Sequence, residues 1–183
     1  MRIVAGREGG RKIFAPKGAD TRPTGDRVRE SLFNVLQGDV PGAVVLDLFA
    51  GSGALALEAI SRGAERAVLV DVWQEAMICV QRNIALLGYE GQTRVIRSDW
   101  KEAVKRLAEQ NCRFSLVFLD PPYRMTDAAG IMECIREAGL LSVGAIVAVE
   151  RQKGAGLSPE PAFAFKGLRR YGNTEVSFFV YQG

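Results

Sequence analysis

The sequence contains no histidine, only three cysteines and no long apolar run. The absence of histidine excludes catalytic triads with a histidine base and metal sites built on imidazole. Cys79, Cys112 and Cys134 form no Cys-x-x-Cys pair, so we expect reduced, mostly buried thiols rather than a zinc site or a disulfide framework. No apolar stretch approaches the roughly 18 residues of a membrane helix, and the N-terminus shows no secretory signal. We therefore expect a cytoplasmic protein without a membrane or metal partner, whose chemistry depends on carboxylates, backbone, aromatics or a cofactor.

The charge is small overall but unevenly distributed. The 183 residues are 48% apolar and 25% charged, as in ordinary globular proteins, and carry a net charge of +3. Residues 1–30 hold eight Lys or Arg against four Asp or Glu, which leaves the remainder at −1. We predict one domain over 1–183, with a basic N-terminal arm or hairpin (1–24) and a catalytic core (25–183). The basic arm suggests a polyanionic partner such as nucleic acid, although a solvated tail is the alternative.

Apolar strands alternate with amphipathic helices along the core. We expect strands at 43–49, 66–72, 93–99, 114–120 and 144–150, and helices at 25–37, 54–63, 75–88, 100–110 and 128–139. This alternation predicts an α/β fold with a parallel sheet covered on both faces. Residues 163–172 and 174–182, divided at Gly172-Asn173, predict an antiparallel hairpin at one edge. Gly9-Gly10 and 154–161 are the expected linkers.

Four of the predicted strands end in a carboxylate. These are Asp47, Asp71, Asp99 and Asp120. Because ligands of an open parallel sheet bind beyond the carboxyl ends of its strands, the four acids predict a lined cleft. Gly51 and Gly53 follow the first acid and would let the backbone approach a ligand. The Gly-x-Gly-x-x-Ala pattern over 51–56 is weak by itself and would also admit a nicotinamide enzyme.

Each acid of the cleft has a functional and a structural interpretation. Asp71 lies where a ribose diol is usually bound, but it could equally cap the helix that begins near Gln74. Asp99 and Trp100 could recognise adenine, or could be a helix cap and a core tryptophan. Asp47 precedes the glycine turn, and there it suits a positive amino or sulfonium group better than a pyrophosphate.

Residues 47–59, DLFAGSGALALEA, resemble the first motif of S-adenosylmethionine-dependent methyltransferases. The order of elements resembles the Rossmann-like, three-layer class I fold of these enzymes, with a mostly parallel seven-stranded sheet and a C-terminal antiparallel hairpin. The resemblance implies S-adenosylmethionine as cofactor, with Asp47 at its methionine part, Asp71 at the ribose and Asp99 at the adenine. The full predicted set is Thr24, Asp47, Ala50, Gly51, Ser52, Gly53, Asp71, Ser98, Asp99 and Trp100.

The strand at 114–120 runs directly into Asp120-Pro121-Pro122-Tyr123. An exocyclic amine on a base is a poor nucleophile, because its lone pair is delocalised into the ring. The Asp120 carboxylate and the Pro121 carbonyl could orient such an amine, since the prolines stiffen the turn. Tyr123 could stack on an extruded base. The alternative is a proline-terminated strand with a surface tyrosine, but the motif resembles the Asp/Asn-Pro-Pro-Tyr signature of amino-directed nucleic-acid methyltransferases.

Both ends of the chain resemble the RsmD family of bacterial small-subunit rRNA guanine-N2 methyltransferases. Residues 2–36, which include Arg22-Pro23-Thr24 and Arg27-Val28-Arg29, resemble its N-terminus, and 170–174 resemble its tail. The resemblance implies methylation of one guanine N2 in 16S rRNA, on the 30S subunit or an assembly intermediate, and we expect a monomer. It places Thr24 over the cofactor. The residues expected to hold rRNA phosphates are Arg2, Arg7, Arg11, Lys12, Arg22 and Arg27.

Two features depart from the family pattern, and two other functions stay open. The family usually has Glu where Asp71 stands, and Trp100 is not expected at its position. One alternative is a DNA adenine-N6 methyltransferase, for which the chain leaves little room for a target-recognition region. The other is a non-catalytic, basic RNA-binding assembly factor, which would not need four intact acids.

Overall fold

The computed structural model describes residues 1–16, 25–122, 125, 127–154, 156–159 and 161–183. Its helices are α1 (Asp26–Val35), α2 (Ala54–Ser61), α3 (Gln74–Leu87), α4 (Trp100–Glu109) and α5 (Ala128–Glu137), with a short 3-10 turn, η1, at Glu90–Gln92. Its strands are β1 (Val44–Asp47), β2 (Arg66–Asp71), β3 (Thr93–Arg97), β4 (Phe114–Leu119), β5 (Leu141–Gln152), β6 (Phe163–Tyr171) and β7 (Thr174–Tyr181). The predicted order of helices and strands is confirmed.

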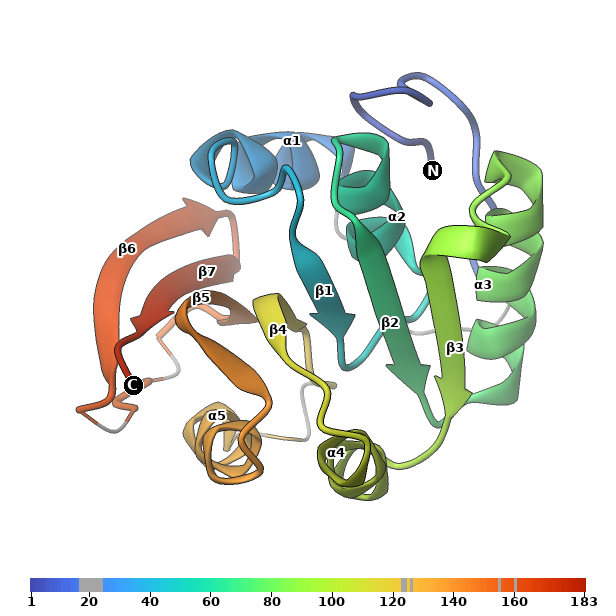
Figure 1. Ribbon diagram of the computed structural model, residues 1–183. Helices are drawn as coiled ribbons and strands as arrows, with labels where there is room; N and C mark the ends of the chain where they lie inside the picture. The colour runs from blue at the N-terminus through green and yellow to red at the C-terminus, as the bar shows by residue number, and fades with distance from the viewer. Residues whose placement is uncertain (17–24, 123–124, 126, 155, 160) are drawn as a thin grey trace.

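The strands form one seven-stranded sheet with the order β3-β2-β1-β4-β5-β7-β6 (Figure 1). The first five strands pair in parallel, whereas β7 runs antiparallel to both β5 and β6. The mostly parallel sheet with a C-terminal antiparallel hairpin was therefore predicted correctly. The sequence did not predict that β7 inserts between β5 and β6. The two-residue turn Gly172-Asn173 joins the paired residues Tyr171 and Thr174, and Gly172 has the positive φ that such a turn favours.

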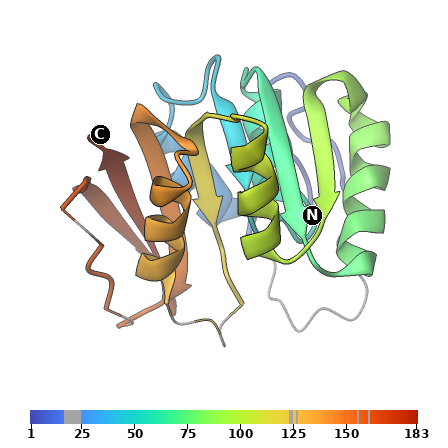
Figure 2. The same cartoon turned by 60° about the horizontal axis from the view of Figure 1, so that its bottom comes forward.

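Helices cover both faces of the sheet, so that the molecule has three layers (Figures 1 and 2). Side chains of one face, such as Val45, Leu69 and Phe118, belong to the core shared with α1, α2 and α3. Side chains of the other face, such as Leu46 and Leu119, pack with α4 and α5. Alternate residues of a strand point to opposite faces, and this explains why continuous apolar runs form these strands.

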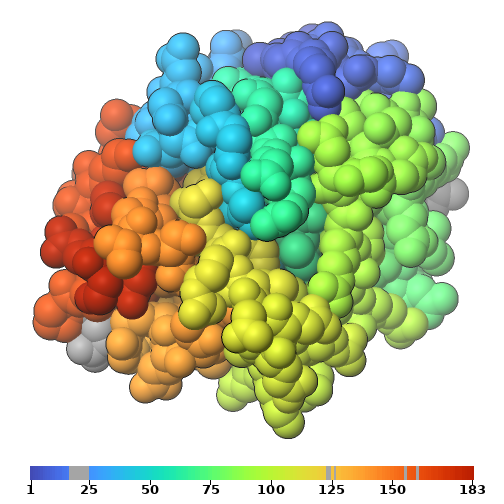
Figure 3. Space-filling view, in the orientation of Figure 1, coloured from blue at the N-terminus to red at the C-terminus, as the bar shows by residue number. Residues whose placement is uncertain are grey.

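The N-terminal arm forms a docked hairpin. Arg2 and Lys12 pair in an antiparallel bridge, and Gly9-Gly10 lie in the turn between them. The prediction of a linker at Gly9-Gly10 is therefore wrong. Gly6 approaches α2 so closely that a Cβ there would lie 2.0 Å from a backbone oxygen of that helix. Figure 3 shows the hairpin lying against the neighbouring helical segments.

Buried polar side chains of α2 and α3 fix this hairpin. The Glu58 carboxylate accepts the backbone N–H groups of Val4 (2.6 Å) and Ala5 (2.9 Å). Asn83 accepts the Phe14 N–H at 2.8 Å and donates to the carbonyl of the same residue at 3.0 Å. Both side chains are fully buried, so losing either partner would leave buried donors and acceptors unsatisfied.

The cysteines lie apart from one another. Cys79 is buried in α3, whereas Cys112 and Cys134 are partly exposed, so the prediction of mostly buried thiols is right only for the first. Among the described residues, no group of three or more Cys, Asp and Glu side chains could hold a metal ion. The same part of the chain contains no helix that is long and apolar enough to cross a membrane.

Candidate active site

Three of the predicted acids project from the same face of the sheet at its carboxyl edge. Asp47 ends β1, where it pairs with Leu69 of β2 and Phe118 of β4. Asp71 and Asp120 each lie two residues beyond these partners. Because residues two apart on a strand share a face, all three carboxylates lie toward the layer of α1, α2 and α3.

A fourth carboxylate, Glu150, continues this row on β5. Leu119 pairs in parallel with Val149, so that Asp120 and Glu150 follow at the same level of the neighbouring strands. The charge of Glu150 contributes to the raised pKa of Asp120, as expected for adjacent acids. Glu150 was not among the site residues predicted from the sequence. The signal was present, because the apolar strand predicted at 144–150 also ends in an acid.

The centre of the row lies at the topological switch point of the sheet. From β1 the chain proceeds outward through β2 to β3, then returns to β4 on the other side of β1. Connections therefore leave β1 and β4 in opposite directions, and at such a switch point the general rule for open α/β sheets predicts a ligand-binding crevice beyond the carboxyl ends of the strands. Asp47 is the last residue of β1, and Asp120 directly follows the last residue of β4. Both acids therefore lie at the switch point.

Asp47 is a buried acid with an unused acceptor atom. It is only 1% exposed, and its Oδ2 accepts the Ala56 N–H near the start of α2 at 3.3 Å. Its Oδ1 is buried and has no hydrogen-bond partner among the described residues. Burial raises the pKa of Asp47 to about 7; the Ala56 N–H opposes this rise, the nearby charge of Asp71 adds to it, and the Phe49 N–H opposes it more weakly. A cation beside Oδ1 would relieve this desolvation, as predicted for an amino or sulfonium group.

The glycine turn is held by Asp71. Its Oδ2 accepts the Gly51 N–H at 2.9 Å, and its Oδ1 accepts the Trp73 N–H at 2.9 Å. The residue before α3 is Trp73, with no side-chain cap, so the alternative role of Asp71 as a helix cap is wrong. An ionised carboxylate offers about four lone-pair sites, and therefore Asp71 retains capacity for a diol.

The backbone of the turn needs its glycines. Gly51 and Gly53 have φ values of +54° and +78°, which other residues rarely adopt. Their neighbours Ala50 and Ser52 are almost fully buried, each 8% exposed. The Ser52 carbonyl accepts a hydrogen bond from Asn83 at 2.9 Å, so the same asparagine supports both the turn and the N-terminal hairpin.

Asp99 caps α4, as in the structural interpretation. Its Oδ1 accepts the Lys101 N–H at 2.9 Å, while the side chain is exposed at the carboxyl edge. The Ser98 N–H donates to the carbonyl of Asp71 at 3.1 Å, which holds the end of β3 beside that of β2. The cap uses one carboxylate oxygen and leaves the other for a ligand.

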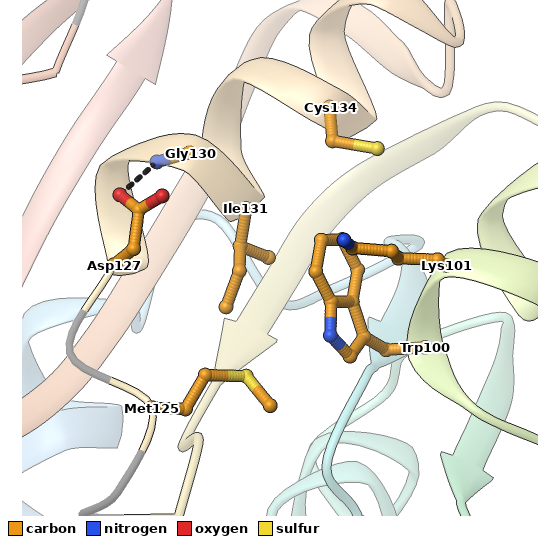
Figure 4. A pocket seen from close by; sticks show the side chains of 7 residues that line it. All are labelled: Trp100, Lys101, Met125, Asp127, Gly130, Ile131 and Cys134. Carbon is orange, nitrogen blue, oxygen red and sulfur yellow. Dashed lines mark hydrogen bonds between the residues drawn. The ribbon is translucent and has the colours of Figure 1, made fainter.

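Trp100 lines a groove between the starts of α4 and α5 (Figure 4). The groove has a volume of about 600 Å³. Its lining residues are Trp100, Lys101, Met125, Asp127, Gly130, Ile131 and Cys134. The Lys101 ammonium lies 5.5 Å from the centre of the indole ring. Trp100 is only partly buried and therefore presents a flat surface to this groove, where a planar ring could pack.

The acid-proline turn extends β4 into the crevice. Asp120 and Pro121 are partly exposed, and Pro122 is exposed. Burial around the Asp120 carboxylate, followed by the charges of Glu150 and Asp47, raises its pKa well above the usual range. The Pro122 carbonyl accepts the Met125 N–H at 2.7 Å. The predicted stacking residue Tyr123 lies outside the described residues.

The residues predicted to hold RNA differ in their contacts. Three arginines bond to protein acceptors: Arg2 to Asp26 (3.0 Å), Arg7 to Gln92 (2.9 Å) and Arg11 to Glu8 (2.7 Å). Lys12 and Arg27 are exposed and form no ion pair with any described residue. Arg22 and Thr24 lie outside the described residues, so their predicted roles stay predictions.

The chain is similar to known proteins over its whole length. The family model described as "Conserved hypothetical protein 95" matches residues 1–180. Ribosomal RNA small subunit methyltransferase D of Escherichia coli (strain K12) is 38% identical over 162 residues, which cover 88% of this chain and 80% of that protein. YlbH of Bacillus subtilis (strain 168) is 35% identical, with both chains covered fully. The solved structure of yhhF from Escherichia coli has a TM-score of 0.88 at 33% identity and covers 100% of this chain and 98% of its own.

Proposed function

Because the chain belongs to the RsmD family of methyltransferases, we propose that it methylates the N2 amine of one specific guanine in small-subunit rRNA. The name of the Escherichia coli relative supports small-subunit rRNA as the substrate class. The observation that carries the chemical proposal is the pair Asp47 and Asp120. One is a buried acid suited to a cation, and the other directly follows the neighbouring strand and precedes two prolines.

The residues of the crevice fit S-adenosylmethionine. When bound, this cofactor supplies a methyl group on a positively charged sulfur. Asp47 offers an unused buried oxygen to its cationic amino acid part, and Asp71 offers lone pairs to the ribose diol. Asp99 and the groove beside Trp100 are suited to an amine-bearing planar ring such as adenine.

Asp120 would orient the target amine and then accept its proton. Its carboxylate accepts one N–H of the guanine amine, and the Pro121 carbonyl accepts the other, which turns the nitrogen lone pair toward the methyl group. As the N–C bond forms, the electron pair of the S–C bond stays on sulfur and one amine proton is lost. A carboxylate with a raised pKa is a better acceptor for that proton than an ordinary one.

The basic residues of the arm and α1 are suited to the rRNA backbone. Lys12 and Arg27 are exposed and free of ion pairs with described residues. Arg2 and Arg11 can exchange their exposed protein partners for phosphates at small cost, because surface ion pairs contribute little. We propose a partly assembled small subunit as substrate, in which the target guanine is still accessible.

Labelled methyl transfer tests this function. With labelled S-adenosylmethionine, the protein should label small-subunit particles that lack the modification, and not duplex DNA. Asp120→Ala should bind the cofactor with unchanged affinity in calorimetry but transfer methyl at least about a hundredfold more slowly, because a positioned acid–base group contributes that much. Asp39→Ala is the matched control, since Asp39 precedes β1 at the opposite edge and pairs with Lys166.

Three results would contradict the proposed function, and each would point to a different alternative. Normal transfer by Asp120→Ala would contradict the role of the acid-proline turn. Preferential labelling of duplex DNA would favour an adenine-N6 methyltransferase. Failure to bind S-adenosylmethionine would favour a non-catalytic assembly factor.

A further inference from the structure

We propose that Glu150 is a specificity-determining residue that accepts the N1–H of the target guanine and so distinguishes guanine from adenine. This inference rests on the proposed function, because it assumes that a base presents its amine to Asp120. It assigns a role to the one acid of the carboxylate row that the proposed chemistry does not use.

The sheet places Glu150 on the substrate side of the site. Along the strand order β2-β1-β4-β5, the row reads Asp71, Asp47, Asp120 and Glu150. The first two are suited to the cofactor and the third to the target amine. Adjacent strands lie about 5 Å apart, so Glu150 is the next carboxylate that a base held at Asp120 would meet.

The side chain of Glu150 lies on the required face. Val149 belongs to the core shared with α4 and α5, whereas Ala148 belongs to the core shared with α1, α2 and α3. Because alternate residues of a strand share a face, Glu150 projects toward the layer of α1, α2 and α3, as Asp120 does. The residue is partly exposed, and its charge acts on Asp120, as expected for two neighbouring carboxylates. A carboxylate has about four lone-pair sites and can accept a further donor beside any existing contact.

The hydrogen-bonding groups on the Watson–Crick edges of guanine and adenine determine which base can bind to Asp120 and Glu150. The Watson–Crick edge of guanine carries the N2 amine and, beside it, an N1–H donor. The corresponding edge of adenine carries an amine beside an N1 lone pair, which is an acceptor. When both carboxylates are ionised they are acceptors only, and in that state they match the adjacent donors of guanine. With adenine, Glu150 would face the N1 lone pair without a hydrogen bond.

A donor on the base would offset the charge repulsion within the row. Glu150 and Asp47 both repel a charge on Asp120, and this contributes to its raised pKa. A base that donates from N1 and N2 would satisfy both acids at once. A base with an acceptor at N1 would add its lone pair to a site that is already negative. A recognition contact of this kind changes discrimination by about 10- to 100-fold.

The test compares guanine with 2-aminopurine at the target position of the rRNA. 2-Aminopurine keeps the N2 amine but has an N1 lone pair in place of the N1–H. Wild-type protein should prefer guanine in kcat/KM. Glu150→Gln can donate from its amide to that lone pair, so the guanine to 2-aminopurine ratio should fall at least about tenfold. Because it is a ratio within one preparation, it does not depend on how much of the variant is folded.

Controls separate this inference from the proposed function. Glu109→Gln changes an exposed acid at the end of α4 and should keep the wild-type ratio. Cofactor affinity should be the same in wild type and Glu150→Gln. An unchanged ratio in Glu150→Gln, with transfer to guanine intact, would overturn the inference alone. Absence of guanine methylation by the wild-type protein would overturn the inference together with the proposed function.

Discussion

Replacing Asp47 by asparagine tests whether the buried, charged carboxylate lowers the free energy of unfolding of the cofactor-free protein. The folded-state pKa of Asp47 is about 7, against an ordinary value of 3.8. Because the pKa is raised on folding, the folded protein binds more protons than the unfolded chain between these values. The free energy of unfolding therefore falls as the pH rises from about 4, and the loss is complete above about pH 8.

The size of this effect follows from the pKa difference. At 1.36 kcal/mol for each pH unit, the carboxylate destabilises the cofactor-free protein by about 4 kcal/mol at pH 8. About 1.4 kcal/mol of this loss develops between pH 6 and pH 8, across the folded-state pKa. Asp47→Asn carries no charge and keeps an acceptor for the Ala56 N–H, so it should be more stable than wild type at pH 8. The difference in free energy of unfolding between Asp47→Asn and wild type should be about 1.4 kcal/mol smaller at pH 6 than at pH 8.

Urea unfolding at the two pH values measures this difference. The free energy of unfolding should depend less on pH in Asp47→Asn than in wild type, whereas Asp39→Asn should keep the wild-type dependence. The same variant should bind S-adenosylmethionine at least about tenfold more weakly in calorimetry, because a charged hydrogen-bonding partner is lost. Equal pH dependence of stability in Asp47→Asn and wild type would refute the burial of a charged carboxylate at this position. Unchanged affinity for S-adenosylmethionine would refute the role of Asp47 in binding the cofactor.

Three further variants test neighbouring parts of the account. Asp71→Asn should weaken S-adenosylmethionine binding by about 10- to 100-fold in calorimetry, because it weakens the support of the glycine turn and the diol site; unchanged affinity would contradict this. Asn83→Ala should lower the free energy of unfolding by about 2 kcal/mol in urea, since three backbone groups lose their buried partner; a neutral result would show that the hairpin is not docked through this side chain. The double variant Lys12→Ala, Arg27→Ala should weaken particle binding and flatten its dependence on salt, measured from 50 to 200 mM; an unchanged salt slope would remove both residues from the rRNA surface.

The sequence predicted the fold well where local pattern decides structure. Apolar runs of strand length between amphipathic segments identify β1 to β5, because both faces of a parallel sheet are buried. The turn at Gly172-Asn173 identifies the final hairpin. The position of β7 between β5 and β6 could not be predicted, since a hairpin has two edges and its own residues do not determine which one joins the sheet.

The candidate site was predicted in part for a similar reason. Acids at strand ends are visible in a sequence, and three of the four selected ones share a face at the crevice. Asp99 also caps α4, and Glu150 was missed although its strand shows the same pattern. The docking of the N-terminal hairpin depends on Glu58 and Asn83, which contact residues more than fifty positions away, and nothing in their own segments indicates those partners.

Identification of the methylated nucleoside tests the central claim most directly. Small-subunit particles that lack the modification would be incubated with the protein and S-adenosylmethionine, and their rRNA digested and analysed by mass spectrometry. We expect methyl transfer to one nucleotide, recovered as N2-methylguanosine, and transfer that is at least about a hundredfold slower with Asp120→Ala. A methyl group on adenine, or on another atom of guanine, would contradict it.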